Sequence, residues 1–162
     1  MSILDTFRLD GRRAVVTGGS AGLGYEIAGA LGEAGAELVI VGRDAERLAA
    51  AAETLAARAP RVTTVRADLE SPAVAERLCD EILGDGAPVE SLVNNVGGRR
   101  VNFPTEEMPL EEWKRILDLN LNQAFVCTKR IGGAMLERHR GRVINVSSIS
   151  GLQPGPQMRG RR

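Results

Sequence analysis

The sequence predicts an α/β fold with a doubly wound parallel sheet at its centre. Two observations predict it: short apolar runs alternate with helical patterns along the chain, and a glycine-rich turn joins the first run to the first helix. Parallel strands covered on both faces form continuous apolar runs, and the helices between them make the crossovers. Right-handed crossovers give the strand order 3-2-1-4-5, which opens a ligand crevice at the carboxyl ends of strands 1 and 4.

Five apolar runs are the expected strands. They cover residues 14–16, 38–41, 62–65, 92–93 and 143–146. Apolar residues at helical spacing predict core stripes on three helices, formed by Leu23, Ile27 and Leu31, by Leu48, Ala52 and Leu55 (residues 45–58), and by Val74, Leu78 and Ile82. A long helix is expected from about residue 109 to 138, with one stripe formed by Trp113, Leu117, Leu121, Phe125 and Thr128. Pro109 and Gly141 suit its two boundaries.

Length and composition are those of one globular domain. The chain has 162 residues, of which 43% are hydrophobic and 26% charged, and its 21 basic residues balance its 21 acidic ones. This balance argues against the basic surface that nucleic-acid or membrane binding needs. No apolar stretch is long enough to span a bilayer, and the N-terminus has no apolar leader, so a cytoplasmic protein is expected. Cys79 and Cys127 fall in helical patterns without metal-ligand spacing, which predicts two buried thiols in a reducing compartment and no metal site.

A glycine-rich turn follows the first expected strand and opens the next helix. Residues 17–24 read Thr-Gly-Gly-Ser-Ala-Gly-Leu-Gly, with glycines at Gly18, Gly22 and Gly24. Glycines let the chain turn sharply and bring backbone N–H groups against a pyrophosphate at the positive end of the helix. A purely structural turn is the alternative, but the position in an N-terminal βαβ unit favours a Rossmann-type dinucleotide site.

The end of the second strand bears on the choice of cofactor. Arg43 lies 25 residues after Gly18, where many NAD-binding folds place an acidic side chain for the ribose 2′-OH. An arginine there pairs with a 2′-phosphate, so NADP (NADPH) is favoured over NAD. Asp44 follows, and its expected role is to cap the next helix. If Asp44 turned toward the ribose instead, NAD would be the cofactor.

Six motifs follow one another along the chain. They are Phe7-x-Leu9-x-Gly11-Arg12, Thr17-Gly18-x-x-x-Gly22-x-Gly24, Asp68-Leu69, Asn94-Asn95-Val96-Gly97, Asn120 in the long helix, and Ser147-Ser148 at the end of the fifth strand. The ordered set resembles the classical short-chain dehydrogenase/reductase family, from residue 7 to about 151. The resemblance implies an NAD(P)-dependent oxidoreductase that transfers a hydride between a nicotinamide cofactor and a small alcohol or ketone.

The resemblance also implies roles for the residues around the cofactor. Ser20, Leu23 and neighbouring backbone hold the phosphates, Asp68 and Leu69 flank the adenine, and Asn95 and Gly97 line the ribose side. Asn94 braces the sheet, and Val96 stands where the family usually has alanine.

Two further residues are implied in catalysis. Ser148 hydrogen-bonds the substrate oxygen, and Asn120 holds a water of the proton relay through a local helix distortion. From local sequence alone, Ser148 is equally a strand-end turn serine, and Asn120 either faces solvent or finds a polar partner.

The resemblance places the proton donor, a tyrosine, about 13 residues beyond Ser148, with a lysine about four residues further on. That position holds Arg161, which is no acid near neutrality, and the lysine position lies past Arg162. The only tyrosine, Tyr25, is expected at the helix surface or packed at the edge of the cofactor, and the only histidine, His139, at a helix C-terminal surface. We therefore expect residues 1–162 to be one C-terminally truncated dinucleotide-binding domain, with strand 5 as an exposed edge and no measurable carbonyl reduction.

Three interpretations stay open. The chain is a truncated or frameshifted family member, a non-catalytic dinucleotide-binding module, or an unstable fragment. The pocket for the substrate would be formed largely by residues absent from the chain, so its identity is not readable. The resemblance implies that family members often pair through the long helix and the helix that follows it. A homo-oligomer of this kind would lack part of its interface here, and the oligomeric state stays open.

Overall fold

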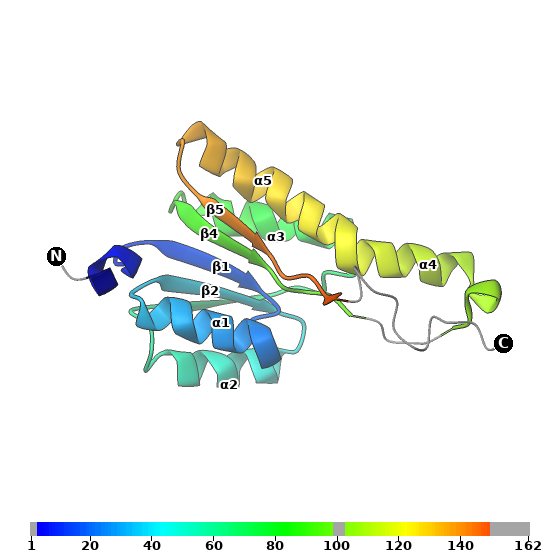
Figure 1. The fold of residues 1–162 in the computed structure, drawn as a ribbon, viewed down its shortest axis with the longest axis horizontal. Coiled ribbons are helices and arrows are strands. Elements are labelled where there is room, and N and C mark those ends of the chain that lie inside the picture. Colours follow the sequence, from blue (N-terminus) through cyan, green and yellow to red (C-terminus); the bar gives the residue numbers. More distant parts are fainter. Residues whose placement is uncertain (1–2, 99–102, 150–162) are drawn as a thin grey trace.

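The computed structural model describes residues 3–98 and 103–149, and these form a five-stranded parallel sheet with helices on both faces (Figure 1). The strands are β1 (Arg13–Thr17), β2 (Glu37–Gly42), β3 (Val62–Arg66), β4 (Val89–Asn94) and β5 (Arg142–Asn145). They pair in the order β3-β2-β1-β4-β5, which confirms the predicted doubly wound, Rossmann-type sheet. The order reverses between β1 and β4, so a crevice is expected at their carboxyl ends.

The helices divide between the two faces of the sheet. They are α1 (Gly22–Glu33), α2 (Ala45–Leu55), α3 (Pro72–Gly84), α4 (Leu110–Leu117) and α5 (Gln123–Glu137), with two short 3-10 turns, η1 (Ile3–Phe7) and η2 (Thr105–Glu107). Helices α1 and α2 cover one face, and α3 and α5 cover the other (Figure 1). None of the helices in the described part of the chain is long and apolar enough to cross a membrane.

Strands β1 and β2 are buried on both faces because each supplies side chains to two cores. In β1, Val15 packs with α3 and α5, while Ala14 and Val16 pack with α1 and α2. In β2, Val39 and Ile40 divide in the same way. This two-sided burial explains why these strands read as continuous apolar runs instead of alternating patterns.

Two of the predicted core stripes are wrong in part. On α1, Leu23 is 69% exposed, whereas Ile27 and Leu31 are half-buried against the core. The fully buried positions of this helix are Gly24, Ala28, Gly29 and Gly32. On the long helical run, Trp113, Leu121 and Phe125 are 51%, 60% and 63% exposed. The buried side chains there are those of Leu119, Gln123, Val126, Cys127, Ile131 and Met135. The other two stripes are largely confirmed, with Leu48 and Leu55 on α2 and Leu78 and Ile82 on α3 in the core.

Strand β5 lies at the edge of the described sheet. It pairs only with β4, and its side chains are exposed, including Val143 at 36% and Ile144 at 47%. The expected exposed edge is therefore present in residues 142–145. An apolar edge strand of this kind offers unpaired backbone groups to other chains.

Candidate functional site

The glycine-rich turn lies at the carboxyl end of β1, where the sheet order reverses. Gly18 and Gly22 have φ values of +67° and +56°, which L side chains rarely adopt. A Cβ on Gly24 would overlap the carbonyl oxygen of Gly18, so the turn and the first helical turn touch through backbone. Helix α1 begins after Ala21, which makes no side-chain cap, so its first N–H groups remain for an anion.

Thr17 holds this turn against the end of β4. Its Oγ1 accepts the N–H groups of Asn95 and Val96 at 2.9 and 3.2 Å and donates to the carbonyl of Val93 at 3.3 Å. The Asn95 side chain returns the contact, because its Nδ2 donates to the carbonyl of Thr17 at 3.1 Å. Two chain segments 78 residues apart are thereby joined at the crevice.

The carboxyl ends of β2 and β3 border an open cavity of about 810 Å³. It is lined by Arg43, Asp44, Ala45, Glu46, Arg66, Ala67, Asp68 and Val74. Asp44 caps α2 as predicted, since its Oδ1 accepts the N–H of Arg47 at 3.0 Å. Leu69, which the resemblance places beside the adenine, is 2% exposed and packs in the core with α3 and α5.

Asn94 joins three elements beneath the crevice. It is buried at the end of β4, and its Nδ2 donates to Thr128 Oγ1 of α5 at 3.0 Å and to Asn145 Oδ1 of β5 at 2.8 Å. On the same helix, Gln123 is buried and its Nε2 donates to the carbonyl of Val96 at 3.1 Å. Side-chain amides therefore join the end of β4 to α5 and β5, and the loop after β4 to α5.

Asn120 lies in a π-helical segment, η3 (Asp118–Asn122), between α4 and α5. Its Nδ2 donates to the carbonyls of Ile116 and Gly98 at 2.8 and 3.0 Å, and its Oδ1 accepts the N–H of Gly98 at 2.8 Å. A π turn widens the helix by one residue and often marks a functional position. The segment is the local distortion expected at Asn120; a role toward a water stays a prediction.

Known proteins that resemble this chain identify its family. A model of the short chain dehydrogenase family matches residues 12–160. The chain belongs to that family. It is 37% identical over 160 residues to galactitol 2-dehydrogenase of Rhizobium johnstonii, which covers 97% of this chain and 62% of that protein. It is 35% identical over 150 residues to gluconate 5-dehydrogenase of Gluconobacter oxydans, across 92% of this chain and 58% of that protein.

Solved structures of the short chain dehydrogenase family share the fold. The 3-oxoacyl (acyl-carrier-protein) reductase of Agrobacterium tumefaciens C58, with NADP bound, superposes with a TM-score of 0.87 at 29% identity. The match covers 96% of this chain and 59% of that one. The present chain thus spans about three fifths of the length of the relatives it matches.

The structure brings most of the predicted residues of this short chain dehydrogenase site to one edge of the sheet. Gly18, Ser20, Arg43, Asp68 and Asn95 follow the carboxyl ends of β1 to β4. Ser148 is exposed and follows β5 at the same edge, where the N–H of Val146 donates to the carbonyl of Asn94 at 2.9 Å. Gly97 and Gly98 are exposed, whereas residues 99–102 of the following loop lie outside the described residues.

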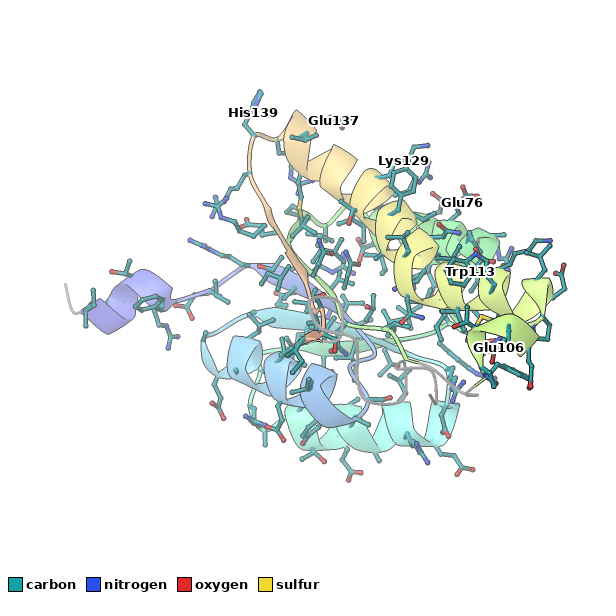
Figure 2. All side chains as sticks on the ribbon, turned by 45° about the vertical axis from the view of Figure 1, so that its right-hand side comes forward. Glu76, Glu106, Trp113, Lys129, Glu137 and His139 are labelled. Carbon is teal, nitrogen blue, oxygen red and sulfur yellow. The ribbon has the colours of Figure 1, made fainter. Side chains whose placement is uncertain are left out.

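Of Tyr25 and His139, only His139 lies away from this edge, because Tyr25 is in the first turn of α1, directly after the glycine-rich turn. Tyr25 is half-buried and packs with α1 and α2 on the outer layer. Figure 2 shows His139 just beyond the C-terminal end of α5, at the opposite end of the long helical run from Trp113. Arg161, at the position of the expected tyrosine, lies outside the described residues.

Sequence reasoning missed three polar residues of the site. Thr17 carries the signal of a hydroxyl between an apolar strand and a glycine turn, which needs a hydrogen-bond partner when buried. Gln123 interrupts an apolar helix and could have been found by the same signal. Arg66 gave no local signal, because its place depends on the pairing of Arg66 with Gly42 across β2 and β3.

Proposed function

We propose that this protein is an NAD(P)-dependent oxidoreductase that acts on a small alcohol or ketone. The observation that carries the proposal is the glycine turn between β1 and α1, an uncapped helix N-terminus at the point where the strand order reverses. When bound, a nicotinamide cofactor accepts or supplies the hydride. The residues of this chain bind and orient it.

The turn fits a pyrophosphate on steric grounds. A Cβ on Gly22 would meet no atom within 4 Å, so the space beside the first turn of α1 is open. Gly18 and Gly24 are packed against each other and against Asn95 instead, and fix the shape of the turn. We infer that Ser20, Gly22 and Leu23 present backbone N–H groups to the phosphates on a turn that Gly18 and Gly24 shape. Asn95 and Gly97 lie on the ribose side, and Asp68 and Leu69 near the adenine.

We favour NADP over NAD. The carboxylate of Asp44, the acidic group nearest to the end of β2, caps α2 and also lies 3.7 Å from Nε of Arg47. The Asp44 carboxylate therefore already has partners within the chain and needs no hydrogen bond from a ribose hydroxyl. Arg43 lines the same cavity and makes no ion pair among the described residues, which leaves its guanidinium for a 2′-phosphate.

For the reaction itself we propose that Ser148 hydrogen-bonds the substrate oxygen and that Asn120 positions a water. Neither supplies a proton at neutral pH, and a positioned donor contributes about 10²–10⁴-fold in rate. We therefore expect the 162-residue chain to bind cofactor without turnover. Carbonyl reduction above that of a Ser148→Ala variant would contradict this expectation.

The test is a titration of the 162-residue chain with NADPH, followed by intrinsic fluorescence or calorimetry. Saturable binding with a rise in the thermal unfolding midpoint supports the proposal. A cooperatively folded chain that binds neither NADPH nor NADH would overturn it.

We also propose that the protein works in the cytoplasm. Cys79 and Cys127 are both buried free thiols, and a reducing compartment keeps such pairs unbridged. Fractionation of cells that express the tagged protein would test this.

A further inference from the structure

A second arginine lies beside Arg43 at the carboxyl ends of the strands. Arg66 is the last residue of β3 and pairs with Gly42 of β2 in the parallel ladder. Its Nε donates to the carbonyl oxygen of Arg43 at 3.1 Å. The guanidinium of Arg66 is thereby tethered to the backbone of Arg43, and both side chains line the same cavity.

Most of the donors of Arg66 are not used by this tether. A guanidinium has five N–H groups, and the contact with Arg43 takes the one on Nε. Within residues 3–98 and 103–149, no carboxylate lies within 4.0 Å of the guanidinium of Arg66 or of Arg43. Two arginines thus face one cavity with donors to spare.

The carboxylates around the cavity repel an anion, so a second cation would favour phosphate binding there. Asp44, Glu46 and Asp68 line it, and Arg47 stands near Asp44. Backbone N–H groups of residues 47 and 70 donate to Asp44 and Asp68, at 3.0 and 3.4 Å, so both carboxylates are partly satisfied in place. A dianionic phosphate in this cavity would still be repelled by them, and a second cation beside Arg43 would offset part of that repulsion.

We propose that Arg66 is a specificity-determining residue, which binds the 2′-phosphate of NADP together with Arg43. The inference rests on the proposed dinucleotide-binding function and assigns a second cation to it. Two guanidiniums at the ends of adjacent strands match the planar, forked recognition of a phosphate. NAD, which carries a hydroxyl at that position, gains nothing from the second arginine.

The first test compares NADPH and NADH affinity in the Arg66→Gln variant of the 162-residue chain. Glutamine keeps a donor for the carbonyl of Arg43 but removes the charge. We expect NADPH binding to weaken by about tenfold or more, since hydrogen bonds to charged groups are stronger than neutral ones, with NADH changed less than twofold. Equal losses for the two cofactors, or no loss for NADPH, would overturn the proposal.

Arg61→Gln is the matched control. Arg61 directly precedes β3, at the end of the strand opposite Arg66, and does not line the cavity. Its substitution changes the net charge of the chain by the same amount as Arg66→Gln. NADPH affinity should be that of the unchanged chain. An equal loss in Arg61→Gln and Arg66→Gln would mean that only the overall charge matters, and would overturn the proposal.

A measurement on the unchanged protein covers the case in which Arg66→Gln does not fold. An arginine-selective dicarbonyl reagent, followed by peptide mass spectrometry, reports the reactivity of Arg66 and Arg61. Saturating NADPH should protect Arg66 at least severalfold, and NADH should not, while Arg61 reacts equally in both. Equal reactivity of Arg66 with NADPH and NADH overturns the proposal, and absence of binding by either cofactor overturns the dinucleotide function itself.

Discussion

Asn120 bonds both backbone groups of Gly98: its Oδ1 accepts the N–H at 2.8 Å, and its Nδ2 donates to the carbonyl at 3.0 Å. The contact joins the π-helical segment η3 to the loop that follows β4. Since the same Nδ2 also donates to Ile116, the side chain fixes the loop and the helix distortion together. The position of residues beyond Asn95 therefore depends on a helix that is not their sequence neighbour.

We expect Asn120→Ala to release this loop. The loss of these hydrogen bonds should lower the free energy of unfolding by about 1–3 kcal/mol and speed amide exchange at Gly98 at least severalfold. Asn122→Ala is the control, because Asn122 lies in the same segment but donates to Asp118 instead of Gly98. Hydrogen exchange followed by NMR measures both; equal protection of Gly98 in the two variants would contradict the assigned contact.

Gly24→Ala should damage the nucleotide turn. The added Cβ would overlap the carbonyl of Gly18 and lie 2.5 Å from Nδ2 of Asn95, so backbone must shift. Overpacking of this kind costs about 1–3 kcal/mol of stability, and NADPH binding should weaken with it. In Gly133→Ala, on α5, the new Cβ meets nothing within 4 Å, and the better helix propensity should stabilise by up to about 1 kcal/mol. Chemical denaturation measures the stability of each variant, and a binding isotherm measures its NADPH affinity. Unaltered NADPH binding by Gly24→Ala would contradict the prediction.

The ion pair between Arg13 and Asp85 predicts a pH dependence. The hydrogen bond from Arg13 Nη1, 2.8 Å long, and the N–H of Ala87 lower the pKa of the Asp85 carboxyl. Because the folded pKa is depressed, the stabilisation is complete above the unfolded pKa of about 4 and is lost as pH falls through the lower folded value. The urea midpoint of Asp85→Asn should lie below that of the parent at neutral pH and approach it in acid. A constant difference between Asp85→Asn and the parent over this pH range would refute the linkage.

Cys79 and Cys127 should react with thiol reagents only after unfolding. They lie on α3 and α5, and both side chains are fully buried. Interaction with the neighbouring Cys127 thiol and burial raise the pKa of Cys79, whereas interaction with Cys79 lowers the pKa of Cys127. Burial is therefore what keeps reagents from both thiols at neutral pH. A colorimetric disulfide reagent at pH 7 should label neither thiol in the folded chain within minutes and both in urea. Rapid labelling of the folded chain would contradict the packing of α3 on α5.

The strand order and the Asp44 cap followed from the sequence, but the faces of two helices followed only in part. Helix α1 buries Gly24 and Ala28 because it packs closely on the sheet, and spacing rules that follow large apolar residues point to Leu23 instead. The long helical run carries apolar residues on two faces, so periodicity alone could not choose between Phe125 and Val126. The π turn also shifts the register between α4 and α5.

Contacts between distant segments were beyond the sequence for a different reason. The Asp44 cap is signalled by local residues and the Asn120 distortion by the family resemblance, and the structure contains both. The tether between Arg66 and Arg43 requires the register of β2 with β3, and the meeting of Cys79 with Cys127 requires the packing of two helices. Neither is encoded in the spacing of neighbouring residues.

The bonds of Thr17 also set an order of events during synthesis. Its partners, the N–H groups of Asn95 and Val96, follow it by 78 and 79 residues, so the ribosome makes the glycine turn long before the groups that hold it. The first three strands can pair early, but β1 gains its second neighbour only when β4 has emerged. Nucleotide binding by a nascent chain would therefore begin abruptly at this length, and would report that the centre of the sheet has closed.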